Sequence, residues 1–326
     1  MNQEIEMTVC CLAYNHKKYI KKAIDSILKQ KTKFRFEVLI NDDASTDGTT
    51  DIIKEYERKY PDVVKGIYHE QNQYSLGKIV FLQQFGMSRG KYIATCECDD
   101  YWSDENKLQR QYEIMESNPD ISLCTHSVRH VQEDGSPKNI IQPSFLENGK
   151  IDGDRFIQLM LTRKEQSIFH YSSYCFRKKY VKELIENTPE FLLAAPVGDI
   201  FLQLYFGCCG NIYYIKEEMS HYRRNSVGSW TLTNRVKEKK IKHWQCMISA
   251  YKLFNDYTRN KYRHEIDEYT TDIGFQINLI KNDLKKICSD KQRFAQLSAL
   301  KKVRVFLCYY FPILESLYII IKKMKR

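Results

Sequence analysis

Acidic residues gather in two short segments of the sequence. The segment Asn41–Gly48 reads NDDASTDG and the segment Glu97–Trp102 reads ECDDYW, so each carries three carboxylates. Carboxylates at this density repel one another at neutral pH unless a cation or hydrogen-bond donors compensate their charge. Hard divalent cations take carboxylate and phosphate oxygens as ligands. The two segments together therefore predict a site where a divalent cation meets a phosphorylated ligand.

Each acidic segment also has a purely structural explanation. Asp, Ser and Thr favour turns, and Asp47 stands where a residue would cap the helix that follows. On its own, Glu97–Asp100 is typical of a solvated acidic turn. Capping alone does not explain the adjacent carboxylates of Asp42 and Asp43. We therefore expect Asp47 to cap the helix, and we favour the cation site for the rest of the two segments.

Alternating strands and helices would bring these segments together. Such alternation predicts a mostly parallel sheet covered by helices on both faces, and ligands bind such sheets at the carboxyl ends of the strands. The segment Ala13–His16 and both acidic segments each follow a predicted strand. Strands are predicted over Met7–Leu12, Phe36–Ile40, Val63–Tyr68, Tyr92–Cys96 and Ile121–Thr125, and helices over Tyr19–Gln30, Thr49–Tyr60, Ile79–Met87 and Asn106–Ser117.

The motifs, in this order and spacing, resemble those of family 2 glycosyltransferases with the GT-A fold. The resemblance rests on Ala13–His16, Asp42–Thr49, Gly90–Ala94 and Glu97–Trp102, and it extends to Trp230. It implies an α/β fold of GT-A type, in which helices flank a Rossmann-like, mostly parallel sheet. Beyond the resemblance, the pattern of charged helices from Arg235 onward predicts a C-terminal helical extension. The resemblance further implies an inverting transfer of a sugar from a nucleotide-sugar donor, by default a UDP-sugar, to a glycan or lipid-linked acceptor in bacterial surface-polysaccharide synthesis.

The resemblance assigns roles to individual residues. Tyr14 would lie against the nucleotide base, Asp43 would bond the base or ribose, and Asp99 would hold Mn²⁺ or Mg²⁺ against the donor diphosphate. Glu97 stands where the family motif usually has Asp, and Asn225 where many members have a metal-binding His. The predicted donor site comprises Ala13, Tyr14, Asn15, Asp43, Lys78, Glu97, Cys98, Asp99 and Arg223, and the predicted metal ligands are Asp99 and Asn225.

A further acidic residue stands alone in an apolar stretch. Asp199 is the one acid between Phe191 and Lys216, and Val197–Phe201 resembles the family motif whose carboxylate deprotonates the acceptor hydroxyl. Apolar neighbours raise the pKa of a carboxyl group, which suits a general base. The alternative is a helix N-cap. We favour the catalytic role for Asp199, whereas we expect His170 to be a hydrogen-bonded core histidine.

Charge and cysteine content narrow the range of partners. The net charge of +10 indicates polyanionic partners. The sequence shows no arginine-rich arm, zinc finger or RNA-binding aromatic signature, so we expect no nucleic-acid partner. The 11 cysteines include no C-x-x-C pair, and several lie in apolar runs, which favours a reducing cytoplasm. The polar start Met1–Glu4 is not typical of a signal peptide.

The chain is long enough for one α/β domain and a smaller appendage. We predict a glycosyltransferase domain over residues 1–233, with a nucleotide half at 1–132 and an acceptor half at 151–233. The turn-rich stretch Glu133–Gly153 would link the halves. Residues 234–326 would form a helical, membrane-associating region.

The apolar stretch Val303–Ile321 is interrupted by Arg304, Pro312 and Glu315, which makes it a poor membrane span. Lysines on both sides favour binding in the plane of an anionic membrane surface. We therefore expect a cytoplasmic protein that is peripheral at the inner face of the cell membrane. A helix packed on the enzyme, or in the interface of a homo-oligomer, is the alternative.

Two other functions remain open from the sequence. A sugar-nucleotide nucleotidylyltransferase would need a glycine-rich phosphate loop after the first strand, but Ala13–Lys17 has no glycine. A catalytically inactive GT-A-like binding module would tolerate the substitutions at Glu97 and Asn225. The retained aspartates of the three motifs argue against such a module.

Overall fold

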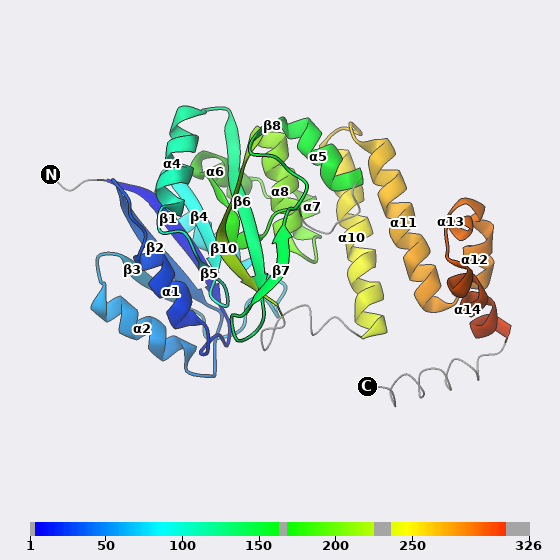
Figure 1. Cartoon of the computed structure of the whole chain (residues 1–326), viewed down its shortest axis with the longest axis horizontal. Coiled ribbons are helices and arrows are strands. Elements are labelled where there is room, and N and C mark those ends of the chain that lie inside the picture. Colours follow the sequence, from blue (N-terminus) through cyan, green and yellow to red (C-terminus); the bar gives the residue numbers. More distant parts are fainter. Residues whose placement is uncertain (1–3, 163–167, 225–235, 311–326) are drawn as a thin grey trace. The chain divides into compact units, whose positions relative to one another are not determined.

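The computed structural model describes residues 4–162, 168–224 and 236–310 (Figure 1). The chain divides into two compact units. The first consists of residues 1–193 and 197–232, and the second of residues 194–196 and 233–326. The first unit is built on one sheet, and the described part of the second is helical.

One mixed sheet forms the middle of the first unit. β1 pairs in parallel with β2 and β4, β2 with β3, and β6 with β10, whereas β5, β7, β8 and β9 pair antiparallel. A central sheet flanked by helices confirms the predicted α/β class, but the sheet is mixed rather than mostly parallel, because five of its nine strand pairings are antiparallel. In spatial order the strands are β3 (Val64–Tyr68), β2 (Arg35–Asp42), β1 (Ile5–Ala13), β4 (Tyr92–Glu97), β9 (Cys175–Arg177), β6 (Ile121–Val131), β10 (Asn211–Arg223) and β5 (Tyr101–Trp102), with β7 (Pro137–Gln142) on β6 and β8 (Gly149–Ile151) on β10.

Several elements differ in extent from the prediction. β6 was expected to end at Thr125, yet it continues to Val131 because it pairs with β10 along that whole length. The stretch Glu133–Gly153, predicted as a link, contains the strands β7 and β8. Its turn-forming residues therefore mark the loops around two short strands, which add to the sheet through backbone hydrogen bonds.

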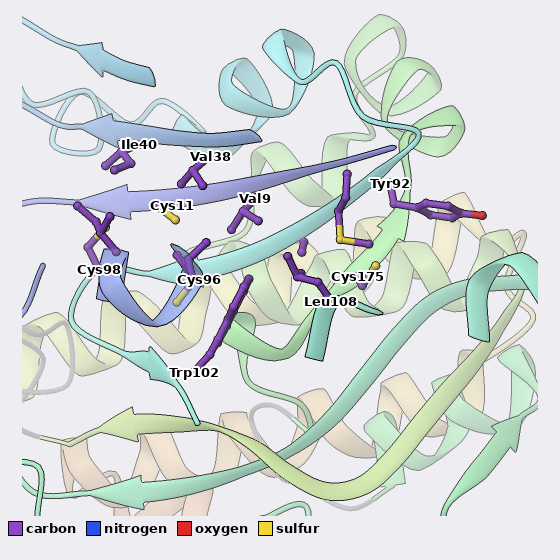
Figure 2. Close-up of a cluster of buried hydrophobic side chains, with 14 of the residues drawn as sticks. Val9, Cys11, Val38, Ile40, Tyr92, Cys96, Cys98, Trp102, Leu108 and Cys175 are labelled. Carbon is purple, nitrogen blue, oxygen red and sulfur yellow. The ribbon is translucent and has the colours of Figure 1, made fainter. Parts of the chain in front are cut away.

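Three helices cover one face of the sheet: α1 (Ile20–Leu28), α2 (Thr49–Lys59) and α4 (Lys107–Ser117). In α1 the buried residues Ile20, Ala23, Ile24 and Ile27 recur at helical spacing and form one apolar stripe. The core that they join also contains Val9, Val38, Trp102, Leu108 and the buried thiols of Cys11, Cys96, Cys98 and Cys175 (Figure 2). These cysteines act as small hydrophobes in the core.

The opposite face is covered by α3 (Val80–Met87) and α8 (Gly198–Cys209), and α6 (Lys178–Glu186) packs beside α3. Phe176 of β9 lies between Phe85 of α3 and Phe206 of α8, with ring centroids 5.1 and 4.6 Å away. Its neighbour Cys175 points into the other core, because successive side chains of a strand alternate between faces. Both faces of the sheet are therefore buried.

The register of the central strands aligns the loops that carry the acidic residues. Ala13 of β1 pairs with Asp42 of β2, and Leu12 of β1 pairs with Glu97 of β4. The three strands are parallel, so the loops that follow them leave the sheet at the same edge. This arrangement confirms the predicted convergence of Ala13–His16 with both acidic segments.

The second unit begins with a helical hairpin. Tyr251 of α10 packs against Tyr269 of α11, and Phe254 packs against Tyr262 just before α11. None of the helices that the structure describes combines the length and apolar character needed to cross a membrane. The helices are α10 (Lys237–Tyr257), α11 (Arg263–Lys281), α12 (Leu284–Ser289), α13 (Lys291–Ala295) and α14 (Ala299–Tyr310).

Candidate functional site

Hydrogen bonds join the loops that follow β1 and β2. Asn15 adopts a left-handed backbone conformation (φ 56°) and accepts a hydrogen bond from the Thr46 amide at 2.8 Å through its side-chain oxygen. The Asn15 amide donates to Ser45 Oγ at 2.9 Å, and the Asp43 amide donates to the Ala13 carbonyl at 2.9 Å. The two loops therefore form one rigid edge. Tyr14, which lies between Ala13 and Asn15 in the sequence, is 44% exposed at this edge.

Asp43 is buried under a third loop. Its carboxylate accepts hydrogen bonds from the backbone amides of Gln73 (2.6 Å) and Tyr74 (3.1 Å), so it holds the loop that leads to the exposed Lys78. A carboxylate offers about four lone-pair sites. Two amide donors leave capacity for a ligand, and the predicted contact with a nucleoside stays a prediction.

Asp47 lies one residue before the predicted position, because the N-cap of α2 is Gly48, yet its side chain still bonds to the start of the helix. Its carboxylate accepts from the amide and the hydroxyl of Thr49 at 3.0 and 2.6 Å, and from the Lys17 amide at 2.9 Å. Gly48, with a φ of 96°, supplies the left-handed turn between them. The residue therefore satisfies backbone donors next to a helix terminus.

The segment Glu97–Asp100, which we call the acidic loop, divides into buried and accessible groups. Cys98 is buried in the core, and its amide donates to the Leu12 carbonyl at 2.9 Å. The Asp100 side chain is fully buried and accepts from Ser172 Oγ at 2.6 Å and from the Arg223 amide at 2.9 Å. The Glu97 side chain, in contrast, is 39% exposed. Glu97 and the partly exposed Asp99 therefore offer the carboxylates that a ligand can reach.

A short helix brings His170 and Ser172 to the acidic loop. This 3-10 helix (Tyr171–Ser173) begins directly after His170, whose Nδ1 accepts from the Ser172 amide at 3.3 Å. Nδ1 also lies 3.5 Å from Asp100 Oδ2, and Nε2 lies 3.9 Å from Glu97 Oε2. One ligand atom from each of Glu97, Asp100 and His170 lies within 4.8 Å of the others. His170 is thus nearly buried and hydrogen-bonded, as the sequence predicted, and it also contacts the acidic loop, which the sequence did not predict.

Burial and mutual repulsion perturb the protonation of this cluster. Burial, followed by the charges of Asp99, Asp100 and Asp199, raises the pKa of Glu97 well above its usual range. Burial and the charge of Asp99 raise the pKa of Asp100, against the opposing hydrogen bonds from Ser172 and Arg223. Burial lowers the pKa of His170 to about 3, so its imidazole is neutral. A bound cation would relieve the repulsion and stabilise the charged carboxylates.

Arg223 lies behind the acidic loop. Its guanidinium donates to the carbonyl oxygens of Asp99 (2.9 Å) and Glu133, and it lies 4.6 Å from the ring centroid of Tyr19. These contacts fix the backbone position of the acidic loop. The predicted contact of Arg223 with the donor diphosphate stays a prediction, and Asn225, the second predicted metal ligand, lies outside the described residues.

Asp199 lies in the first turn of α8, for which Val197 is the N-cap, so the capping alternative is wrong. One carboxylate oxygen accepts from the Ile200 amide at 2.8 Å. Burial raises the pKa of Asp199 to about 6. The charge of Asp199 contributes to the raised pKa of Glu97, so Asp199 lies within electrostatic reach of the acidic loop.

Comparison with known proteins identifies the family. The family model "Glycosyl transferase family 2" matches residues 8–185, which covers β1 through α6, and the chain therefore belongs to this family. The protein Rv1520 of Mycobacterium tuberculosis is 32% identical over 225 residues, which make up 69% of this chain. The chain spans about 60% of the length of that relative.

Solved glycosyltransferases share the fold at low sequence identity. The Staphylococcus aureus protein TarS (residues 1–349, in complex with UDP-GlcNAc) superposes with a TM-score of 0.60 at 17% identity, covering 82% of this chain and 71% of its own. The mannosyltransferase PcManGT of Pyrobaculum calidifontis, in complex with GDP-Man and Mn²⁺, gives 0.56 at 15% identity, covering 95% and 82%. These similarities establish the GT-A fold of the chain.

The position of Ser172 generates a prediction about stability. Its buried hydroxyl donates to Asp100 and accepts from the Glu97 amide at 3.2 Å. Ser172→Ala leaves both groups without this partner, so we expect the free energy of unfolding to fall by about 1–3 kcal/mol. Urea denaturation followed by circular dichroism measures the change. Ser75→Ala, which removes an exposed hydroxyl, is the control, and equal stability of both variants would contradict the role of Ser172.

Proposed function

We propose that the protein is an inverting glycosyltransferase that moves a sugar from a nucleotide-sugar donor, by default a UDP-sugar, to a glycan or lipid-linked acceptor in surface-polysaccharide synthesis. One observation carries the proposal: three parallel strands end in loops that converge at one edge of the sheet, with Asp199 in electrostatic reach of the acidic loop. In open sheets of this kind, nucleotides bind at that edge. The family membership supports the reaction class.

The donor would lie across the loops that follow β1, β2 and β4. The exposed ring of Tyr14 and the carboxylate of Asp43 would contact the nucleoside, and the backbone of Ala13 and Asn15 would line the same edge. The diphosphate would lie toward Asp99. Three further residues complete the proposed site. Lys78 lies on the loop that Asp43 holds, and the hydrogen bonds of Cys98 and Arg223 fix the backbone of the acidic loop.

The accessible carboxylates of the acidic loop fit a divalent cation, Mn²⁺ or Mg²⁺. Asp99 and Glu97 would supply oxygen ligands, and a cation beside them would oppose the burial and the neighbouring acidic charges that raise the pKa of Glu97. A bound cation would neutralise charge on the departing nucleoside diphosphate. The solved structure of PcManGT in complex with GDP-Man and Mn²⁺ supports this choice. Asn225 remains a proposed additional ligand.

Asp199 is the proposed general base. Its carboxylate takes the proton of the acceptor hydroxyl while the hydroxyl oxygen bonds to the anomeric carbon and the nucleoside diphosphate leaves from the opposite face. A pKa of about 6 leaves the group mostly deprotonated at pH 7 yet basic enough to accept this proton.

The pH dependence and a substitution test this assignment. Because Asp199 must be deprotonated, we expect kcat/KM to rise as the pH increases through about 6. Asp199→Asn should lower kcat by about 10²- to 10⁴-fold, the usual contribution of general acid–base catalysis. The measurement is nucleoside diphosphate release from a panel of UDP-, GDP- and dTDP-sugars with Mn²⁺, in the presence of saccharide acceptors.

The matched control is Asp51→Asn, which changes an exposed aspartate in the first turn of another helix and should leave the rate unchanged. Full activity of Asp199→Asn would overturn the assignment of the base. Binding of a nucleotide sugar without any turnover would favour an inactive binding module. A requirement for a sugar phosphate and a nucleoside triphosphate would favour a nucleotidylyltransferase.

We also propose that the second unit holds the enzyme peripherally on the anionic inner face of the cell membrane, which places it in the cytoplasm. Apolar and aromatic side chains of α14 are exposed, from Leu300 (84%) through Phe306 to Tyr310. Lys301 and Arg304 lie among them and are also exposed. Apolar groups with interspersed basic residues suit the interface of an anionic bilayer, where a lipid-linked acceptor would be available.

Vesicle co-sedimentation of the full chain tests the membrane proposal. We expect binding to phosphatidylglycerol-containing vesicles and little binding to pure phosphatidylcholine vesicles. Leu300→Asp should weaken binding, and Lys301→Gln should reduce the affinity about fivefold, because each basic residue contributes about 1 kcal/mol near such a surface. Leu193→Asp, at an exposed leucine of the first unit, should bind as the parent does. Equal binding by all variants, or a concentration-dependent dimer without vesicle binding, would contradict the proposal.

A further inference from the structure

The imidazole of His170 contacts the acidic loop, although the proposed reaction assigns it no function. Its side chain is only 12% exposed, and its two nitrogens face two different carboxylates of the acidic loop. Nδ1 faces Asp100, whose side chain is fully buried, whereas Nε2 faces Glu97, whose carboxylate is accessible. The ring is also packed on Tyr222, with centroids 4.0 Å apart. The imidazole is therefore fixed in orientation between a buried and an accessible acid.

The surroundings of Nδ1 accommodate both neutral tautomers of His170. The Ser172 amide at 3.3 Å supports the form in which Nδ1 accepts a hydrogen bond. Asp100 Oδ2 at 3.5 Å supports the form in which Nδ1 carries the proton and donates it. In the second form the lone pair of Nε2 points toward Glu97. A carboxylate on the far nitrogen is the usual partner of a metal-binding histidine, because it fixes the tautomer and raises the basicity of the ligand atom.

The geometry separates direct ligands from supporting groups. Ligand atoms bind at about 2.0–2.3 Å from such ions, so two ligands on opposite sides of one ion lie about 4 Å apart. The 3.9 Å between His170 Nε2 and Glu97 Oε2 fits this spacing. Asp100 already accepts from Ser172 and Arg223, which leaves it to orient His170. The charge of Asp99 also acts on the His170 imidazole, so this second accessible acid of the loop lies within electrostatic reach of the ring.

We propose that His170 Nε2 is a ligand of the divalent cation at the acidic loop, oriented through Nδ1 by Asp100, and that this nitrogen makes the site prefer Mn²⁺ to Mg²⁺. The inference rests on the proposed function, since it concerns the cation of the same site. Mg²⁺ demands oxygen ligands in near-octahedral geometry, whereas first-row transition metals accept imidazole nitrogen. A site with Glu97, Asp99 and His170 therefore differs in selectivity from one built on carboxylates alone.

Mn²⁺ bound to the full chain in the presence of UDP provides a direct readout. Electron spin echo envelope modulation should show coupling of the Mn²⁺ electron spin to a histidine ¹⁴N. The coupling should change to that of ¹⁵N when the chain is produced with ¹⁵N-labelled histidine, which distinguishes imidazole from uracil nitrogen. This measurement needs no substitution and no catalytic turnover.

Two variants then assign the signal to His170. His170→Ala should abolish the nitrogen coupling. It should also weaken Mn²⁺ binding about tenfold or more, because even residues that only support a metal ligand contribute about tenfold to metal affinity. The affinity for Mg²⁺ should change much less. The control is His221→Gln, a partly buried histidine whose Nε2 bonds to Glu218 at 2.8 Å, and it should keep the coupling. Circular dichroism of each variant checks that the fold is retained.

The outcomes separate this inference from the proposed function. Mn²⁺ binding without histidine coupling would overturn the role of His170 and leave the metal-dependent transferase in place. Equal losses of Mn²⁺ and Mg²⁺ affinity in His170→Ala would overturn the selectivity. Failure of Mn²⁺ to bind with UDP present would overturn both the inference and the proposed metal dependence.

Discussion

Repulsion among the carboxylates of the acidic loop is the constraint on which this edge of the sheet depends. Two unit charges about 4 Å apart repel by about 4 kcal/mol at an effective dielectric constant of about 20. Asp100 accepts hydrogen bonds from Ser172 and Arg223, which stabilise its charge. Glu97 and Asp99 are partly exposed, and burial, followed by the charges of Asp99, Asp100 and Asp199, raises the pKa of Glu97. The proposed divalent cation, with the diphosphate of the donor, would compensate these acidic charges.

The fold holds these groups in place from several distant parts of the chain. The parallel register of β1, β2 and β4 aligns the three loops, and the buried Cys98 anchors the acidic loop to the core (Figure 2). The short helix after His170 reaches the loop from one side, and the end of β10 reaches it through Arg223 from another. These contacts hold the acidic loop in one position, which suits the proposed binding of a cation and a leaving group.

The elements that follow from local pattern could be predicted from the sequence, and those that follow from distant contacts could not. The apolar stripe of α1 and the apolar strand β1 are visible in the sequence, and so are the acidic segments at the strand ends. The full length of β6 and the strands β7 and β8 depend on pairing with residues far along the chain. The contacts of His170 with the acidic loop could not be predicted for the same reason, because Glu97 and Asp100 lie some 70 residues away and a single histidine carries no spacing signal. The hydrogen bonds of Arg223 with backbone carbonyls likewise have no counterpart in the sequence pattern.

The central claim is that the acidic loop binds a nucleoside diphosphate through a divalent cation. Calorimetric titration of UDP, GDP and dTDP into the full chain, with Mn²⁺ and again with excess chelator, tests it most directly. The account predicts that one of the three nucleotides binds with Mn²⁺ present and that its binding is lost, or at least tenfold weaker, with chelator. Equally tight binding with and without the cation, or no binding of any of them, would contradict it.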